Sequence, residues 1–394
     1  MPSMHRLQVA ARTELTSDSV ALHLRVPQEL HKAYRFKEGQ FLTLQSQVGG
    51  EQMRRPYSIC TSVQDYEESG VLRVGIRCIA NGRFSTWAKS LLKAGDCLEV
   101  MTPEGRFTPP ALPAAEDRPE AADAVAKQGQ ARRGRHHLAF AGGSGITPIM
   151  AILKTRLRAE NDARFTLVYG NRHSQSVMFL EELEDLKNSY LDRFQLIHIL
   201  SEERTEVALH QGLLDAAKCR QLLEGLIDPA SVDVAYICGP EPMMLAAEEA
   251  LHSASVDPRR ILLERFSAAQ PSASEVRLGL TATARAAAEQ GGASGAAPYP
   301  ATSTVRITLD GKERAISVAR EGSSILQSGL QAGLPLPYAC QAGVCCTCRA
   351  RVTQGEVRME RNFSLEASEL EQGFVLSCQA YPLTATVSLS YDER

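Results

Sequence analysis

Hydrophobic and polar residues alternate in short runs over the first hundred residues, and turn residues separate the runs. Val20 to Val26 alternates with period two, which is typical of a half-buried strand. Further strands are expected at 40–48, 52–60, 71–78 and 97–102, with one helical interruption at 84–92. Short strands between regular turns predict a small antiparallel β-barrel over residues 1–110.

The pattern changes to alternating strands and helices over residues 136–266. Strands are expected at 137–141, 165–170, 194–200, 233–238 and 261–265. Helices are expected near 147–159, 178–189, 212–225 and 241–254. This order predicts an α/β domain with a doubly wound parallel sheet.

A third compact domain is expected at 301–394, with α+β composition. Its strands are expected near 305–309, 313–319, 349–353, 374–377 and 385–391, and its helix at 323–332. Two segments lack an apolar period: 111–135 is predicted to be a mobile insertion, and 267–300 a flexible linker.

Composition narrows the class of protein. The chain has 394 residues, 44% hydrophobic and 23% charged, with a net charge of −3. Neither a nucleic acid nor a membrane is therefore expected as a partner. The first residues have no apolar segment of a signal peptide, and the ten cysteines suit metal or redox use in a reducing cytoplasm.

The most specific chemical signal is a group of cysteines near the C-terminus. Cys340, Cys345 and Cys348 follow the spacing C-x4-C-x2-C, and Cys378 stands alone further on. This is the plant-type [2Fe–2S] ligand pattern, in which thiolates hold the iron. A zinc site would more often show paired short hooks, and a disulfide framework would need a secreted chain. Cys346 falls outside the ligand spacing.

The barrel contains residues suited to a flavin nucleotide. Arg55 can grip a pyrophosphate, the ring of Tyr57 can stack on a heteroaromatic ring, and Ser58 can hydrogen-bond a ring nitrogen. Ile76-Arg77 follows, and then small and hydroxylated residues precede a helix, where backbone N–H groups favour phosphate: Gly82, Ser85 and Thr86. Taken singly, each motif is more often ordinary structure.

Two loops at the ends of predicted parallel strands suit a second nucleotide. The first contains Gly142, Gly143, Ser144, Gly145 and Thr147, and the second contains Cys238, Gly239, Pro240 and Met243. Glycines let the backbone approach a pyrophosphate, although the usual G-x-G-x-x-G register is missing. An ordinary strand-to-helix turn and a buried strand cysteine remain the alternatives.

These motifs, in this order, resemble known proteins. The first two sets are similar to the flavin and nicotinamide sites of the ferredoxin–NADP reductase family, and the cysteines to plant-type ferredoxin. The whole order resembles the reductase components of oxygenases. The resemblance implies an antiparallel β-barrel FAD domain, an α/β NAD(P)-binding domain and a β-grasp [2Fe–2S] ferredoxin domain. It implies that electrons pass from the nicotinamide through FAD to the cluster.

The resemblance also implies roles for single residues. Arg55, Gly82, Ser85 and Thr86 would hold the FAD phosphates, with Ile76 and Arg77 alongside. Tyr57 would pack on the flavin, and Ser58 would lie near its N5. Gly142 to Thr147 would cradle the pyridine nucleotide, and Cys238 would lie near the nicotinamide C4. Glu264 and Phe266 would close the flavin site. The candidate catalytic residues are therefore those nearest the reacting rings: Ser58, Cys238 and Glu264.

The choice between NADPH and NADH depends on residues after two of the strands. Arg172, Ser201 and Arg204 suit the 2′-phosphate of NADPH, whereas Glu202 and Glu203 suit the free ribose hydroxyl of NADH. The resemblance favours NADPH.

Local sequences point to an acceptor. They are Tyr169 to Arg172, Ser176 to Phe179, Leu196 to Ser201, Glu264 to Phe266 and the doubled Cys345-Cys346. Within the family they resemble reductases that serve the di-iron epoxidase complex of phenylacetate degradation. A Rieske dioxygenase, a desaturase or a steroid hydroxylase is the alternative acceptor, and a non-enzymatic redox-sensing module is the third hypothesis.

Overall fold

The computed structural model describes residues 3–110, 134–266, 302–320 and 322–393. It divides into two compact units, Met1–Glu264 and Arg265–Arg394. The predicted insertion and linker lie almost entirely outside the described residues. Within the described ranges, no helix combines the length and the apolar character needed to cross a membrane.

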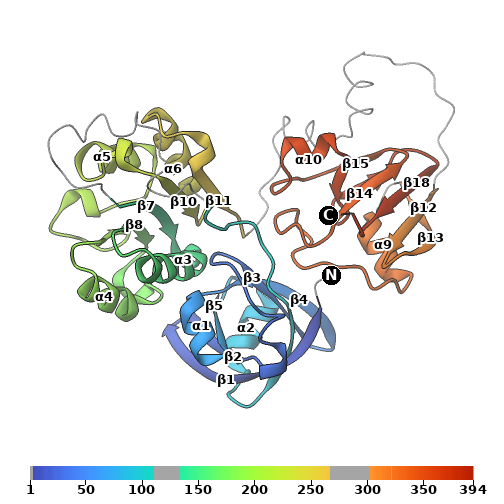
Figure 1. Ribbon diagram of the computed structural model, residues 1–394, viewed down its shortest axis with the longest axis horizontal. Coiled ribbons are helices and arrows are strands. Elements are labelled where there is room, and N and C mark those ends of the chain that lie inside the picture. The colour runs from blue at the N-terminus through green and yellow to red at the C-terminus, as the bar shows by residue number, and fades with distance from the viewer. Residues whose placement is uncertain (1–2, 111–133, 267–301, 321, 394) are drawn as a thin grey trace. The chain divides into compact units, whose positions relative to one another are not determined.

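The first unit begins with a six-stranded antiparallel sheet that curls into a barrel (Figure 1). The strand order is β4-β3-β6-β1-β2-β5, and a bridge between Ile59 and Val74 links the two ends. The strands are β1 (Met4–Thr16), β2 (Ser19–Arg25), β3 (Phe41–Val48), β4 (Glu51–Ser58), β5 (Val71–Arg77) and β6 (Cys97–Met101). Their inward leucines and valines form a core of their own.

The barrel carries two helices, so the prediction of a single helical interruption is wrong. The predicted helix is α2 (Arg83–Ser90), and the additional one is α1 (Val63–Ser69). Ser62 caps α1 by accepting a hydrogen bond from the N–H of Asp65. Gly70 ends it in the left-handed conformation, with a φ of 65°. Capping, rather than an apolar face, therefore defines this helix.

The second part of the unit is a parallel sheet in the order β11-β10-β7-β8-β9. Its strands are β7 (His136–Gly142), β8 (Arg164–Asn171), β9 (Phe194–Leu200), β10 (Val234–Cys238) and β11 (Ile261–Glu264). Its helices are α3 (Ile146–Ala159), α4 (Leu180–Ser189), α5 (Ala216–Gly225) and α6 (Glu241–Ser253). The chain order reverses between β7 and β10, and open sheets bind ligands at such a switch point.

The helices cover both faces of this sheet (Figure 1). Leu138 and Phe140 pack with α5 and α6, whereas Ala139 and Ala141 pack with α3 and α4. The core on the α3 and α4 face also includes barrel residues: Ala21, Cys60 and Phe107. Barrel and sheet therefore share buried apolar surface.

Strand β5 provides much of the barrel's contact with the sheet domain. Arg73 forms an ion pair with Glu182 at 2.6 Å, and Lys154 bridges Glu182 and Asp65 at 2.8 Å each. Two residues on, a Cβ at Gly75 would lie only 2.8 Å from the side chain of Thr147. Gly75 therefore lets the barrel backbone approach the start of α3 closely.

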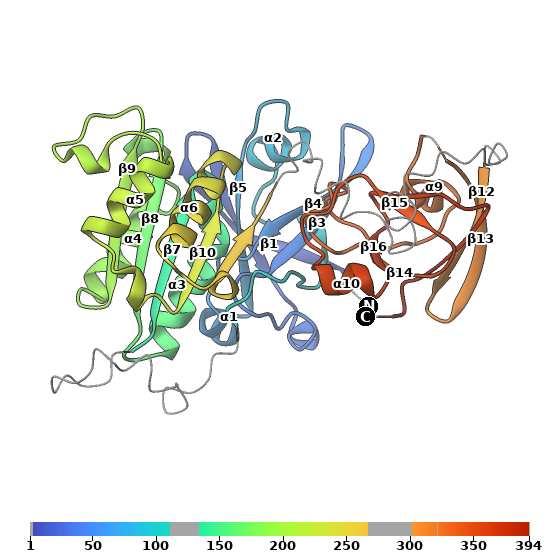
Figure 2. The same cartoon turned by 90° about the horizontal axis from the view of Figure 1, so that it is seen from above.

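The second unit is a five-stranded mixed sheet in the order β13-β12-β18-β14-β16, with a two-stranded sheet beside it. β12 (Thr302–Leu309) and β13 (Lys312–Ala319) form a hairpin, seen from two sides in Figures 1 and 2. The other strands are β14 (Arg349–Gln354), β15 (Val357–Met359), β16 (Phe374–Leu376), β17 (Ala380–Pro382) and β18 (Thr386–Ser390). The helices are α9 (Ile325–Gln331) and α10 (Ala367–Glu371).

Candidate flavin, nucleotide and cluster sites

The predicted flavin-binding residues of β4 lie at its C-terminal end. Tyr57 packs beside Phe84 of α2, with ring centroids 5.9 Å apart. Burial raises the pKa of the Tyr57 hydroxyl, so the ring remains neutral. Ser58 is buried where the strand ends, and Arg55 is exposed, with its guanidinium donating to the carbonyl of Arg54. A flat ring and an exposed guanidinium suit a flavin nucleotide.

The two residues predicted at the end of β5 differ in what they offer. The side chain of Ile76 lies in the barrel core, so it leaves only its backbone for a cofactor. Arg77 forms an ion pair with Asp18 at 2.9 Å, and a Cβ on Gly143 would lie 3.0 Å from its guanidinium. Arg77 therefore reaches the glycine loop of the sheet domain. Sequence reasoning missed Asp18, because its partner is distant along the chain.

The N-terminus of α2 is suited to phosphate. Gly82 precedes the helix, and no side chain caps it. The hydroxyl of Ser85 donates to the carbonyl of Gly82 at 3.1 Å, and no side chain caps the first N–H groups of the helix. Thr86 closes the turn with its N–H on the same carbonyl. The predicted phosphate-binding residues therefore lie together.

The two glycine-containing loops meet at the switch point of the parallel sheet. A Cβ at Gly145 would lie 2.0 Å from the carbonyl oxygen of Cys238, and one at Gly239 would lie 2.9 Å from the N of Gly142. A Cβ at Gly142 would also lie 2.8 Å from the sulfur of Met243. Backbone thus packs on backbone, which only glycine permits here.

Hydrogen bonds hold the first loop in shape. Gly143 has a φ of 52°, in the left-handed region. The hydroxyl of Tyr169 donates to the carbonyl of Gly143 at 2.9 Å, and that of Thr147 to the carbonyl of Ser144 at 2.9 Å. Both side chains are buried. The loop is preformed, as a pyrophosphate cradle would need to be.

Cys238 and Glu264 end neighbouring strands and are paired in register. Burial, and then the charge of Glu264, raise the pKa of the Cys238 thiol well above its usual value. The thiol is therefore protonated at neutral pH. Phe266, which was predicted to act with Glu264, lies in the second unit and is exposed.

The residues predicted to choose between NADPH and NADH follow β8 and β9. The N–H of Ser201 donates to the carbonyl of Asn171, which ties the two strand ends together. Arg172 and Arg204 are exposed. The carboxylate of Glu203 accepts a hydrogen bond from the N–H of Ser174 at 2.7 Å.

The four predicted cluster cysteines form two pairs in the second unit. The thiols of Cys340 and Cys345 hydrogen-bond each other, and so do those of Cys348 and Cys378. Within the described part of the chain, no three His, Cys, Asp or Glu side chains converge as ligands of a single metal ion. Two pairs of thiols match a binuclear cluster with two ligands on each iron.

The sulfur of Cys340 is already in an environment suited to a thiolate. The Cys345 thiol and the N–H groups of Ala342, Val344 and Cys345 donate to it, and they lower its pKa below the usual range despite burial. Cys345 has its pKa raised well above the usual value by this partner and by burial. The thiol of Cys346 instead donates to the carbonyl oxygen of Ser364, with 3.4 Å between sulfur and oxygen.

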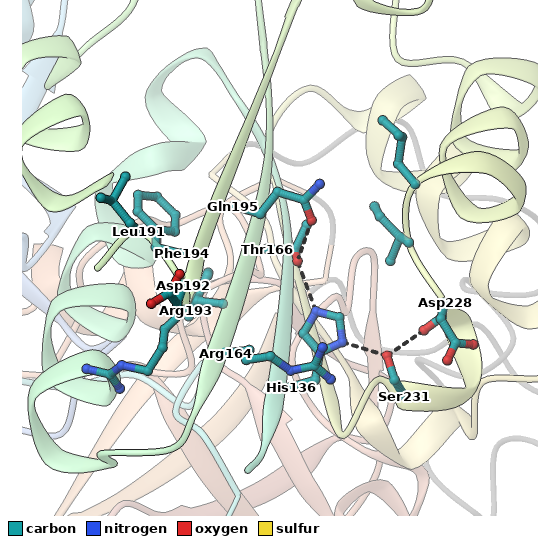
Figure 3. A pocket seen from close by; sticks show the side chains of 13 residues that line it. His136, Arg164, Thr166, Leu191, Asp192, Arg193, Phe194, Gln195, Asp228 and Ser231 are labelled. Carbon is teal, nitrogen blue, oxygen red and sulfur yellow. Dashed lines mark hydrogen bonds between the residues drawn. The ribbon is translucent and has the colours of Figure 1, made fainter. Parts of the chain in front are cut away.

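A cavity of about 280 Å³ lies at the amino ends of β7, β8 and β9, at the other end of the strands from the two glycine-containing loops (Figure 3). His136 hydrogen-bonds the hydroxyls of Ser231 at 2.8 Å and Thr166 at 2.9 Å. Burial lowers the pKa of His136 to about 4, so the ring is neutral. These contacts join strands and loops, and the predicted site residues lie elsewhere.

Three family models match successive parts of the chain. An oxidoreductase FAD-binding domain matches residues 6–108, an oxidoreductase NAD-binding domain residues 140–249, and a 2Fe-2S iron-sulfur cluster binding domain residues 307–383. A subunit of the 1,2-phenylacetyl-CoA epoxidase from Escherichia coli is 40% identical, over all of this chain and 99% of the relative. The chain belongs to the oxygenase reductase family.

This oxygenase reductase has further relatives along its whole length. The ferredoxin reductase component of 3-ketosteroid-9-alpha-monooxygenase from Mycolicibacterium smegmatis is 35% identical over 98% of this chain and 97% of the relative. The solved structure of phthalate dioxygenase reductase has the same fold, with a TM-score of 0.56 at 21% identity and 98% coverage of both chains. The predicted three-part fold is confirmed.

The family confirms the predicted cofactors and the order of electron transfer. The protein is an NAD(P)H-dependent oxidoreductase that uses FAD and a [2Fe–2S] cluster. A nicotinamide releases two electrons as hydride and a cluster accepts one, and bound FAD supplies the chemistry that connects them. The contribution of the chain is to bind, orient and shield these groups.

Proposed function

We propose that this oxygenase reductase supplies electrons to a di-iron phenylacetyl-CoA epoxidase in phenylacetate degradation. The observation that carries the proposal is the 40% identity with the 1,2-phenylacetyl-CoA epoxidase subunit, over nearly the full length of both chains. The 35% identity with the steroid monooxygenase component makes a steroid hydroxylase the second candidate acceptor. We also propose a cytoplasmic location, which is supported by the ten cysteines, none of which forms a disulfide.

The proposed cluster ligands are Cys340, Cys345, Cys348 and Cys378, supported by their grouping in two pairs. For the nicotinamide, we propose the two glycine-containing loops, with Cys238 near its reacting carbon. For FAD, we propose the residues predicted on the barrel, from Arg55 to Thr86, and Glu264 beside them. The close approach of Arg77 to Gly143 supports this arrangement, because it brings flavin and nicotinamide residues together.

We propose NADPH as the electron donor. Arg172 and Arg204 are exposed in the segments that follow β8 and β9, where Ser201 also lies, and their guanidinium groups suit a 2′-phosphate. The carboxylate of Glu203 already accepts the N–H of Ser174, so one of its two oxygens is engaged. These observations favour the phosphorylated nucleotide over NADH.

A reconstituted assay tests the acceptor. Purified protein, NADPH, phenylacetyl-CoA and the oxygenase subunits of a phenylacetyl-CoA epoxidase are combined, and epoxide formed is measured against NADPH consumed. We expect about one epoxide per NADPH. Matched reactions use a steroid monooxygenase as acceptor, or NADH as donor. NADPH oxidation without epoxide, with full reduction of an artificial acceptor, would refute the epoxidase as partner and leave the electron-transfer chemistry intact.

A further inference from the structure

The two residues that flank Cys378 both reach back to the loop that carries the other three cysteines. The hydroxyl of Ser377 donates to the carbonyl of Cys348 at 2.9 Å. Tyr391 in turn donates to Ser377 at 2.7 Å, and both side chains are buried. This relay anchors the backbone on one side of Cys378.

On the other side, Gln379 makes a different kind of contact. Its side-chain nitrogen lies 3.0 Å from the carbonyl of Gln341 and 3.1 Å from that of Cys378. The same nitrogen is 3.7 Å from the sulfur of Cys378, within the range of an N–H···S hydrogen bond. A primary amide has two hydrogens, so one can be donated to the carbonyl of Gln341 while the carbonyl and the sulfur of Cys378 share the other.

The surroundings of Gln379 keep this amide in place. The side chain is 8% exposed. A Cβ on Gly343 would lie 3.3 Å from its Cγ, so the cysteine loop packs on the stem of the glutamine. The carbonyl that Gln379 holds belongs to Gln341, which has a φ of 54° in the left-handed region. Gln379 therefore stabilises a turn in which Gln341, a residue other than glycine, has a positive φ that such residues seldom adopt.

We propose that Gln379 is a positioning residue that raises the reduction potential of the cluster. An N–H donor beside a ligating sulfur stabilises the more negative, reduced state, and hydrogen bonds to sulfur are one of the means by which proteins set such potentials. The same amide ties the Cys378 segment to the Cys340 loop. This inference rests on the proposed ligand assignment of Cys378.

The variants compare the loss of the Gln379 amide with the loss of an anchoring hydrogen bond that involves no sulfur. Gln379→Leu removes the donor and keeps much of the volume. Gln379→Glu keeps the shape but replaces the amide nitrogen with a carboxylate oxygen. Tyr391→Phe removes the outer bond of the relay through Ser377 and touches no sulfur.

The experiment is a redox titration of the full-length protein with dithionite and mediators, followed by the electron paramagnetic resonance signal of the reduced cluster. At the potential where the wild-type cluster is half reduced, we expect Q379L to lower the ratio of reduced to oxidised cluster roughly three- to tenfold. A tenfold change corresponds to about 59 mV for one electron. Q379E should lower the ratio further, because it adds negative charge, and Y391F should leave the ratio unchanged.

The role of Gln379 and the ligand role of Cys378 are tested by different results. An unchanged ratio in Q379L and Q379E, with wild-type iron content, would overturn the proposal. An equal shift in Y391F would overturn it as well, because it would indicate a general loosening of the loop. If Q379L loses its cluster, the near-isosteric Q379E decides. Iron content that is unaffected in Cys378→Ser would instead refute the proposed function of Cys378.

Discussion

Replacing Gly145 with alanine tests whether the two loops at the switch point are in contact. Gly145 has φ and ψ of −61° and −11°, which any residue adopts, so alanine adds no backbone strain. The cost comes only from the new methyl group, which would lie 2.0 Å from the carbonyl oxygen of Cys238. Contacts below 3.0 Å are not tolerated, so the loops must separate by about 1 Å.

Overpacking of this kind costs about 1–3 kcal/mol. If the unfolding equilibrium carries this cost, the melting temperature falls by roughly 2–4 °C per kcal/mol for a unit of this size. If the loops open instead, the nucleotide cradle is distorted. At 1.4 kcal/mol per factor of ten, NADP⁺ would then bind roughly 5- to 150-fold more weakly. FAD content should be retained, because the barrel residues are unaffected.

The assay combines thermal unfolding with titration of NADP⁺, followed by the flavin difference spectrum. Gly225→Ala is the matched control, because Gly225 is helical and a Cβ there meets nothing within 4 Å. We expect the control to keep wild-type affinity and equal or slightly higher stability. Wild-type melting temperature and wild-type NADP⁺ affinity in G145A would refute the argument that the loops touch.

Cys378→Ser should lose much of its iron and acid-labile sulfide while NADPH still bleaches the flavin; unchanged iron would contradict the ligand assignment. Arg204→Ala should raise the KM for NADPH roughly tenfold and barely change that for NADH, and equal effects on both would contradict a phosphate contact. Burial raises the pKa of Glu160, but hydrogen bonds from His137 and Arg156 outweigh it and lower the pKa to about 2, so this group's contribution to stability in urea should be lost as the pH falls from about 4.5 to about 2. Glu160→Gln should flatten that loss, and an unchanged acid profile in this variant would argue against the linkage.

Local patterns predicted most of the large elements, but β1 (Met4–Thr16), the longest strand that the structure describes, was not among the predicted strands. The alternation in Val20 to Val26 and the strand–helix order of the sheet domain correspond to observed elements, because burial of one face imposes a period. Helix α1 was missed because Tyr66 is its only buried residue. Its ends are nevertheless marked in the sequence by Ser62, with Asp65 three residues on, and by Gly70. Strands β15 and β17 have three residues each, too few for any period.

The candidate sites were predictable as motifs and not as geometry. Glycines and cysteines stand at fixed spacings, because backbone approach and thiolate ligation allow few substitutes. Contacts between distant residues leave no local signal. The pairing of Arg77 with Asp18 joins two barrel segments, and the amide of Gln379 faces Gln341 only after the chain folds. Ile76 was predicted together with Arg77 to bind the cofactor, but its side chain faces the barrel core.

The shared core of barrel and parallel sheet bears on how such proteins are recombined. Ala21, Cys60 and Phe107 are buried among residues of α3 and α4, so a crossover between relatives inside Met1–Glu264 would join surfaces that did not evolve together. A crossover after Glu264 would leave both cores whole. Chimeras that exchange the region from Arg265 onward should therefore retain flavin reduction by NADPH, and the acceptor that each chimera reduces would show which unit recognises it.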